Sequence, residues 1–304
     1  MSDRKLRWGV LGCARIATQA VIPGIQESET GEVVAIASRD SSKAKETAAK
    51  LGIPIVYDSY DALLASNDVD AVYIPLPNHL HKDWAIMTAE AGKHVLCEKP
   101  IALNAHEAKE MVDACERAQV KLAEAFMYRH HPRYERMKTI IDSGEIGDIR
   151  GIHGTFTFNN AQDTNNVRYK RFMGGGGLYD VGCYPISAAR LILGREPEAA
   201  TVQAFHSPEH DNVDMMASGL IEFPGAVGLT FDCGMWADFR NTLEILGTDG
   251  RIVVPNAFVG DPNFLYLQMV NVEKRRLLHL INMHCKRITS VGVFYLTSHY
   301  GLIR

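Results

Sequence analysis

The stretch HVLCEKP, residues 94–100, places two ionisable side chains at the end of an apolar run. Residues 95–97 have the composition of a short buried strand, and Glu98 and Lys99 follow them directly. Pro100 has no amide N–H, so it stops strand pairing at once. A carboxylate and an amine held at this point could take part in proton-transfer chemistry. The alternative is an ordinary strand end that meets water, where lysine and glutamate are common.

A second stretch, MGGGGLYDVGCYPIS at residues 173–187, combines four consecutive glycines with two further polar side chains. The glycines allow the backbone to pass close to a ligand. Asp180 and Tyr184 are four residues apart, so both can point to one side of a helical turn. An alcohol passes a hydride only when its O–H proton leaves, and a tyrosine, with a pKa of about 10, accepts that proton readily only beside a positive charge. The alternatives are a helix N-cap at Asp180 and a core tyrosine at Tyr184.

The N-terminal stretch GVLGCARIA, residues 9–17, has the pattern of a dinucleotide-binding turn between a strand and a helix. Its spacing reads Gly12-x-Ala14-x-x-Ala17, a G-x-G-x-x-G pattern with alanine at the second and third positions. The third position tolerates alanine, whereas the methyl group of Ala14 moves a bound pyrophosphate slightly outward. The predicted cofactor contacts in this turn are Gly12, Ala14, Arg15 and Ile16. The alternative is an ordinary strand-to-helix turn.

The end of the next apolar run indicates which dinucleotide would bind. An acidic residue about 20 residues after the turn normally holds the ribose 2′-hydroxyl of NAD. Ser38 and Arg39 occupy that place here, and Lys43 follows one helical turn later. Because arginine can grip a 2′-phosphate, the sequence predicts NADP(H) in preference to NAD(H), with these three residues in contact with it. The alternative is a solvated Arg39 beside a helix cap at Asp40, which leaves room for NAD.

These residues lie in two regions of different texture. Over residues 1–125, short β-branched runs alternate with amphipathic segments, which predicts βαβ units and a parallel sheet. Asn104 with Glu107 three residues later, and Ser41 with Ser42, are predicted helix caps. Residues 126–304 carry runs typical of antiparallel strands, with one helix near residues 185–193 between them. We therefore predict an α/β chain with an N-terminal dinucleotide-binding domain and a C-terminal α+β domain built on a mostly antiparallel sheet.

Composition sets further bounds. The chain has 304 residues, 46% of them hydrophobic and 22% charged, which suits a two-domain globular protein. A net charge of −4 with no basic stripe argues against nucleic acid and anionic membranes as partners. The six cysteines are scattered singly, and no apolar run reaches membrane-spanning length, so we expect a cytoplasmic protein with reduced thiols. His130 and His131 have no carboxylate or cysteine at ligand spacing, and we predict no metal site.

The three stretches GVLGCARIA, IPLPNHLHKDWAIMTAEAGKHVLCEKPIALN and GGGGLYDVGCY together resemble the glucose–fructose oxidoreductase / inositol dehydrogenase / MocA (Gfo/Idh/MocA) family. The resemblance covers residues 5 to about 260. It implies a Rossmann domain followed by a sheet domain whose open face often makes a dimer, so a homodimer or higher homo-oligomer is expected.

The resemblance also implies roles for residues at matching positions. Lys99 resembles the lysine that projects between cofactor and substrate, next to a Lys–Pro bond that is often cis. Glu98 resembles the glutamate near the nicotinamide ribose. The further residues that the resemblance places at the cofactor are Pro75, Asn78 and His81, and those that it places at the substrate are Tyr128, Arg129, Asn166, Arg168 and Asp180.

Many relatives carry histidine at the position of Tyr184, and tyrosine resembles the branch with dihydrodiol and D-xylose dehydrogenases. We therefore predict an NADP-dependent oxidoreductase that transfers a hydride between nicotinamide and a sugar or vicinal-diol hydroxyl. In this hypothesis Tyr184 takes the proton, Lys99 orients the oxygen and Asp180 binds a sugar hydroxyl. The alternatives are an NADPH-dependent ketosugar reductase and a non-catalytic NADP-binding regulatory protein.

The segment from about Leu265 departs from the family pattern. It is basic, with Glu273 as its only acid after Gln268, and it lacks clean helical periodicity. We interpret it either as a truncated or frameshifted ending or as an ending specific to one lineage.

Overall fold

The computed structural model describes residues 4–259, 268–271 and 277–279. Within them the chain forms two compact units, which divide after Phe126. Apart from two short strands, the segment that the sequence marks as atypical lies outside the described residues.

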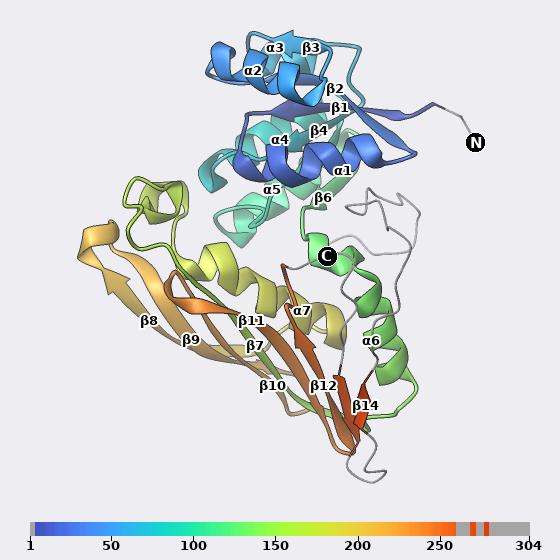
Figure 1. The fold of residues 1–304 in the computed structure, drawn as a ribbon, viewed down its shortest axis with the longest axis vertical. Coiled ribbons are helices and arrows are strands. Elements are labelled where there is room, and N and C mark those ends of the chain that lie inside the picture. The colour runs from blue at the N-terminus through green and yellow to red at the C-terminus, as the bar shows by residue number, and fades with distance from the viewer. Residues whose placement is uncertain (1–3, 260–267, 272–276, 280–304) are drawn as a thin grey trace. The chain divides into compact units, whose positions relative to one another are not determined.

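The first unit is built on a six-stranded parallel sheet in the order β3-β2-β1-β4-β5-β6 (Figure 1). Its strands are β1 (Leu6–Leu11), β2 (Gly31–Ala37), β3 (Ile55–Tyr57), β4 (Ala71–Ile74), β5 (His94–Cys97) and β6 (Leu122–Glu124). The order reverses between β1 and β4, and ligands of such sheets bind beyond the carboxyl ends of the strands at that reversal. The predicted Rossmann arrangement is confirmed.

Helices cover both faces of this sheet, which explains why every residue of β4 is buried. One face carries the helix with the π-turn η1 (Ala17–Val21) and α1 (Ile22–Glu27), together with α2 (Ser41–Leu51). The other face carries α3 (Tyr60–Ala65), α4 (His81–Glu90) and α5 (Ala105–Arg117). The predicted cap of α5 is present, since Asn104 Oδ1 accepts from the Glu107 amide at 2.9 Å. At α2 the cap is Asp40, not Ser41, and Asp40 Oδ1 accepts from the Lys43 amide at 3.0 Å.

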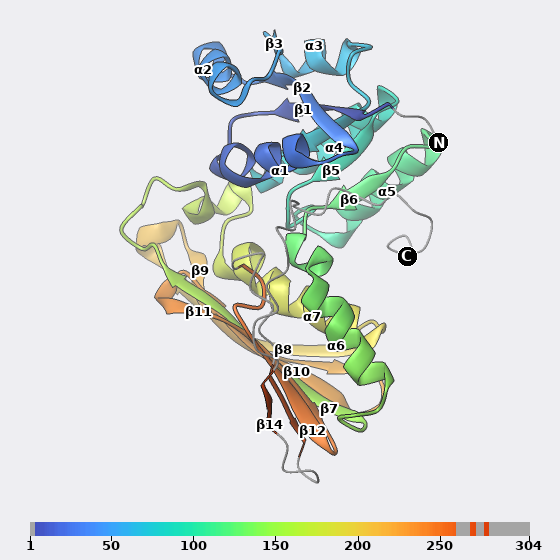
Figure 2. The same ribbon diagram turned by 45° about the vertical axis from the view of Figure 1, so that its right-hand side comes forward.

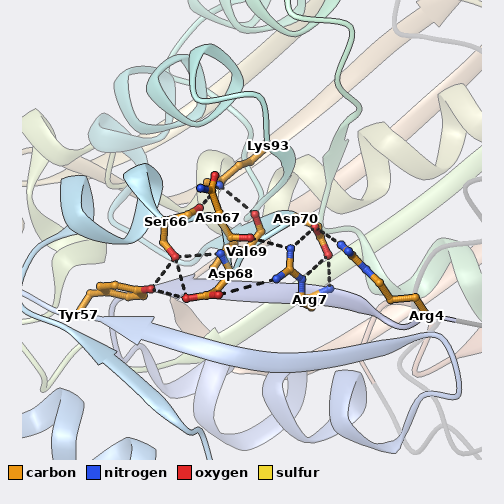
Figure 3. A network of polar contacts seen from close by, with 9 residues as sticks. All are labelled: Arg4, Arg7, Tyr57, Ser66, Asn67, Asp68, Val69, Asp70 and Lys93. Carbon is orange, nitrogen blue, oxygen red and sulfur yellow. Dashed lines mark hydrogen bonds and ion pairs between the residues drawn. The ribbon is translucent and has the colours of Figure 1, made fainter.

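A charged network fixes the amino-terminal end of this sheet (Figure 3). Asp70, just before β4, accepts from the backbone and guanidinium of Arg7 in β1 at 2.8–3.0 Å, and from Arg4 at 2.6 Å. Hydrogen bonding to Arg7 holds the pKa of the Asp70 carboxyl well below its ordinary value. Buried Lys93, just before β5, donates to the carbonyl oxygen of Val69 at 2.9 Å. These partners meet at the end of the strands opposite to the carboxyl ends.

The second unit is built on an eight-stranded sheet in the order β14-β13-β12-β11-β7-β10-β9-β8. Its strands are β7 (Ile149–Asn159), β8 (Ala199–Ser207), β9 (Val213–Phe223), β10 (Val227–Gly234), β11 (Trp236–Gly247), β12 (Gly250–Pro255), β13 (Gln268–Asn271) and β14 (Leu277–His279). Every pair is antiparallel except β7 with β10, so the predicted mostly antiparallel sheet is confirmed.

Two helices of this unit, α6 (Pro132–Asp142) and α7 (Cys183–Leu193), lie beside each other against one face of the sheet (Figures 1 and 2). Gly154 of β7 permits the close approach of α7, because a Cβ there would lie 2.5 Å from the Cβ of Pro185. Among the described helices none is long and apolar enough to cross a membrane. Within the same residues, no group of three or more His, Cys, Asp or Glu side chains could hold a metal ion.

Candidate active site

The glycine turn after β1 has the geometry of a phosphate-binding turn. Gly12 adopts a φ of +98°, which favours glycine, and its amide donates to the Ala37 carbonyl oxygen at 2.6 Å. A helix begins at Arg15, and the first amides of a helix lack an acceptor within it and attract anions. Ala14 is half-buried at this point, while Ile16 packs against the core and supports the turn from below. The turn therefore fits the pyrophosphate of a dinucleotide.

Two exposed cations stand at the end of β2. Arg39 and Lys43 are both exposed, whereas Ser38 is buried and its Oγ accepts from the Asp40 amide at 3.2 Å. Ser38 therefore shapes the loop, and the guanidinium of Arg39 is exposed beside the first turn of α2. A 2′-phosphate would find positive charge and a helix N-terminus here.

Tyr60, the first residue of α3, contacts both the Gly12 turn after β1 and the Arg39 loop after β2. The sequence did not predict this contact. The Tyr60 hydroxyl lies 3.6 Å from where a Cβ on Gly12 would stand, and it is hydrogen-bonded by the backbone of Arg39. Burial raises the pKa of the Tyr60 hydroxyl, and the charge of Arg39 acts against that shift. The ring packs edge-on against Trp84 with centroids 4.9 Å apart. A tyrosine directly after an Asp-Ser pair carries no local signal of this contact.

The Lys99–Pro100 bond is cis, as the resemblance implied. Glu98 is held on both oxygens: Tyr73 donates its hydroxyl to Oε1 at 2.7 Å, and the Lys99 amide donates to Oε2 at 3.2 Å. Tyr73 lies on the neighbouring strand β4 and is fully buried, so Glu98 is fixed from within the sheet. Glu98 and Lys99 themselves are half-buried.

His81 occupies a structural position that corrects its predicted role. It has no exposed surface, and its ring nitrogens face two backbone carbonyl oxygens, Nδ1 that of Pro100 at 2.9 Å and Nε2 that of Leu76 at 2.7 Å. Burial lowers the pKa of the imidazole, and the charge of Lys99 lowers it further. His81 therefore joins the loop after β4 to the loop after β5. Pro75 is likewise buried, while Asn78 is half-buried at the start of the short helix η2 (Asn78–Leu80).

In the second unit, Tyr184 lies in the first turn of α7 within an aromatic cluster. Its ring is 4% exposed and packs against Phe156 at 5.2 Å, Phe258 at 5.6 Å and Tyr128 at 5.9 Å between centroids. The turn before α7 is a π-helix, η6 (Leu178–Gly182), which carries Asp180. Such π-turns within helices are frequent at functional sites.

Asp180 forms an ion pair with Arg168, and this brings three predicted residues together. Arg168 Nε donates to Asp180 Oδ2 at 2.7 Å, and Asn166 Oδ1 accepts from the Arg168 amide at 3.1 Å. The Asp180 carboxylate raises the pKa of Arg168, with smaller contributions in the same direction from Tyr169 and Tyr184. Tyr184 is thus within electrostatic range of a guanidinium that the sequence did not connect with it.

The four-glycine loop packs against its own chain, and this corrects the expectation that its glycines admit a ligand. The Gly176 amide donates to the Arg168 carbonyl oxygen at 2.9 Å, and the Leu178 amide donates to Asp214 Oδ2 at 2.6 Å. A Cβ on Gly176 would overlap Asp214 Oδ1, and one on Gly175 would lie within 2.4 Å of the Arg168 oxygen, closer than real Cβ contacts allow. Asp214, which comes from β9, therefore fixes the start of the π-turn that carries Asp180. Burial raises the pKa of the Asp214 carboxyl.

Tyr128 and Arg129 anchor α7 through Ser187. Arg129 donates two hydrogen bonds to Ser187 Oγ, at 2.7 and 3.2 Å, so the serine proton is left for the hydroxyl of Tyr128. Tyr128 is 2% exposed, and burial raises the pKa of its hydroxyl while the hydrogen bonds of Ser187 and Arg129 oppose the shift. Tyr128 thus supports the ring of Tyr184, which revises its predicted contact with substrate. Ser187, three residues after Tyr184, was detectable in principle by helical spacing.

The fold is that of a nicotinamide-dependent oxidoreductase of the Rossmann class. Residues 6–126 match the oxidoreductase family with an NAD-binding Rossmann fold, and residues 134–253 match the GFO/IDH/MocA C-terminal domain. The chain therefore belongs to the Gfo/Idh/MocA family, as its sequence motifs predicted.

Individual relatives cover most of the chain. A D-xylose 1-dehydrogenase (NADP(+)) of Haloferax volcanii is 42% identical over 84% of this chain and 78% of its own. A trans-1,2-dihydrobenzene-1,2-diol dehydrogenase of Xenopus laevis is 32% identical over 82% of this chain and 75% of its own. A 3-ketoreductase of Actinomadura kijaniata, crystallised with NADP and TDP-benzene, superposes with a TM-score of 0.83 at 33% identity, over 89% of this chain and 82% of its own.

The glycine loop yields a stability prediction. Gly176→Ala combines a φ of +123° with overlap at Asp214 and should lower the free energy of unfolding by about 3 kcal/mol. Gly144→Ala is the matched control in the same unit, with a φ of +75° and nothing within 4 Å of the new Cβ, and should lose about 1 kcal/mol. Urea or thermal unfolding of both variants measures the difference. Equal losses would show that Asp214 does not constrain the loop.

Proposed function

We propose that this protein is an NADP-dependent oxidoreductase that transfers a hydride between nicotinamide and a hydroxyl group of a sugar or vicinal diol. The observation that carries the proposal is the arrangement on the second unit, where Tyr184, Asp180 and Arg168 form one polar group at the edge of an aromatic cluster. An acceptor for a hydroxyl proton stands there beside a charged pair that can bind neighbouring hydroxyls. Residues 126–304 would thus form the substrate-binding domain.

The cofactor assignment rests on the first unit. The Gly12 turn offers backbone amides at a helix N-terminus, and Arg39 offers an exposed cation where the 2′-phosphate of NADP would lie. The relatives named as NADP-dependent or crystallised with NADP support the same preference. Asp40 is engaged as the helix cap, so it is less suited to hold the 2′-hydroxyl of NAD.

The proposed chemistry divides the work among three side chains. Bound NADP⁺ supplies a hydride acceptor at the nicotinamide C4. Tyr184 takes the proton from the substrate hydroxyl, and the Lys99 ammonium orients the substrate oxygen and favours the tyrosinate form. Asp180, held by Arg168 at 2.7 Å, accepts a hydrogen bond from an adjacent substrate hydroxyl.

A ketosugar reductase is the second candidate, and it uses the same residues in reverse. Tyr184 would then donate its proton to the oxygen of a carbonyl substrate. The similarity to the 3-ketoreductase of Actinomadura kijaniata supports this direction, whereas the similarity to the xylose and dihydrodiol dehydrogenases supports oxidation.

Turnover tests the proposal directly. We expect NADPH formation with D-xylose, D-glucose or a cyclic trans-diol, and a fall in kcat of at least about 100-fold in Lys99→Met and Tyr184→Phe. NADPH binding, followed by its fluorescence, should persist in both variants. Tyr57→Phe and Lys109→Met, outside the site, are matched controls that should keep the wild-type rate. A chain that binds NADPH but neither oxidises these substrates nor reduces a ketosugar would contradict the proposal.

Cofactor preference has a test of its own. Arg39→Ala removes the cation expected at the 2′-phosphate and should raise the Kd of NADPH about 10- to 100-fold, while the Kd of NADH changes by less than about threefold. Lys45→Ala, an exposed lysine on the same helix α2, is the control. If the wild-type enzyme is faster with NAD⁺ than with NADP⁺, the Arg39 argument fails and the proposed chemistry still stands.

We also propose that the face of the eight-stranded sheet opposite α7 makes a homodimer. Strand register aligns Glu244, His153, Thr230, Leu220 and Thr201 in one row across five strands of that face. The row combines polar side chains with Leu220, which is 41% exposed, and Phe205 nearby on β8 is 56% exposed. A sheet face that mixes polar and apolar side chains in this way suits a symmetric interface.

Light scattering should therefore give twice the mass of one chain, and Leu220→Arg should give the mass of one. Leu191→Arg is the matched control, because Leu191 is equally exposed at 42% but belongs to α7. A monomeric wild-type protein, or a Leu220→Arg variant that still dimerises, would contradict this interface.

A further inference from the structure

We propose that Glu124 is a positioning residue for Lys99, holding the backbone of the loop that carries the amine. This inference rests on the proposed function, since it concerns the geometry of the same lysine. Glu124 was not among the residues predicted from the sequence, and it lies at the end of β6, whereas Lys99 follows β5.

The argument begins with the backbone that leaves the sheet. Strand β5 ends at Cys97, so the polar groups of the following residues need partners outside the strand ladder. The Lys99 amide donates to Glu98 Oε2 at 3.2 Å, the Pro100 carbonyl oxygen faces His81 Nδ1 at 2.9 Å, and the Ile101 amide donates to Glu124 Oε1 at 3.0 Å. Three successive residues are thus each bonded by a side chain from a different position: the end of β5, the start of α4 and the end of β6.

Of these three contacts, that of Glu124 spans the gap between two strands. Glu124 is the last residue of β6 and pairs in register with Cys97, the last residue of β5. The contact with Ile101 therefore turns the chain back over the ends of both strands directly after the Lys99–Pro100 bond. Glu98 acts from the other face, through Tyr73 at 2.7 Å, because side chains alternate along β5. The loop is held from both faces of the sheet.

Electrostatics agree with this placement. Both Glu98 and Glu124 raise the pKa of the buried Cys97 thiol, after burial itself, so the two carboxylates flank the same strand end. The charge of Lys99 lowers the pKa of His81, so the ammonium lies within electrostatic range of the histidine that holds Pro100. Lys99 and the three side chains that bond its loop therefore lie close together at the end of β5.

The Ile101 amide needs an acceptor oxygen, which a neutral amide side chain can supply as well as a carboxylate. The length of the side chain at position 124 should therefore matter more than its charge. Glutamine keeps an oxygen at the same distance from the backbone, whereas aspartate keeps the charge and withdraws the oxygen by one methylene. We expect Glu124→Gln to retain kcat within about threefold, and Glu124→Asp and Glu124→Ala to lower kcat about 10- to 100-fold with the Kd of NADPH nearly unchanged. Glu116→Ala, an exposed glutamate on α5, is the matched control.

The decisive experiment is a double-mutant cycle between Glu124→Ala and Lys99→Met, with kcat, KM and NADPH binding measured in the intact chain. If Glu124 acts through Lys99, the Glu124 change should lower kcat in the wild type and have no further effect once Lys99 is gone. Thermal unfolding of each variant shows whether it folds, and Glu124→Asp takes the place of Glu124→Ala if the latter does not. Additive losses, or an aspartate variant more active than the glutamine variant, would overturn the inference. Absence of turnover in the wild type would instead contradict the proposed function.

Discussion

Backbone that leaves a sheet at a functional edge must have its amides and carbonyls bonded by something other than a neighbouring strand, and this requirement shapes both units. After β1, the Gly12 amide turns back to the Ala37 carbonyl oxygen at 2.6 Å. After β5, side chains take over, and the Ile101 amide is bonded by Glu124. In the second unit, the Leu178 amide is bonded by Asp214 from β9 at 2.6 Å. In each case the anchored segment adjoins a residue with proposed chemistry.

The same requirement explains why a glycine and a half-buried carboxylate occur together in the second unit. Asp214 can reach the start of the π-turn only because Gly176 has no side chain, and its burial raises the pKa of the carboxyl. Strand β9 thus supplies the Asp214 carboxylate as an acceptor for the Leu178 amide, in a place where an amide without an acceptor would cost free energy of folding. Asp180, two residues after Leu178, is then presented to Arg168 from a turn whose start is fixed by the sheet.

The sequence predicted what local spacing can encode. The Gly12 turn, the Asn104 cap, the alternation of strands and helices and the change to an antiparallel sheet all depend on residues within a few positions of each other, and the structure has them. It did not predict Tyr60 beside Gly12, Glu124 at Ile101 or Asp214 at Leu178, because each pair is brought together by strand order and not by spacing. The motifs placed His81 and Tyr128 in contact with cofactor and substrate, whereas in the structure both side chains are buried and their polar atoms are bonded within the protein. A sequence motif therefore locates the region of the site. The hydrogen bonds and burial of each side chain are needed to tell a residue that could contact a ligand from one that holds a loop in place.

The surroundings of Tyr184 act on the protonation state of its hydroxyl in two opposite ways. Its ring is packed by Phe156, Phe258 and Tyr128, and an apolar environment favours the neutral phenol over the phenolate. Arg168 acts in the opposite sense, since a nearby cation favours the phenolate, and Lys99 would add to it in the proposed mechanism. A phenol suits the reduction of a carbonyl, and a phenolate suits the oxidation of an alcohol. In the proposed mechanism, Asp180 holds Arg168 and Glu124 holds the loop of Lys99, so both carboxylates would influence which form of the hydroxyl predominates. Glu124 would exert this influence on the hydroxyl of Tyr184 without touching substrate.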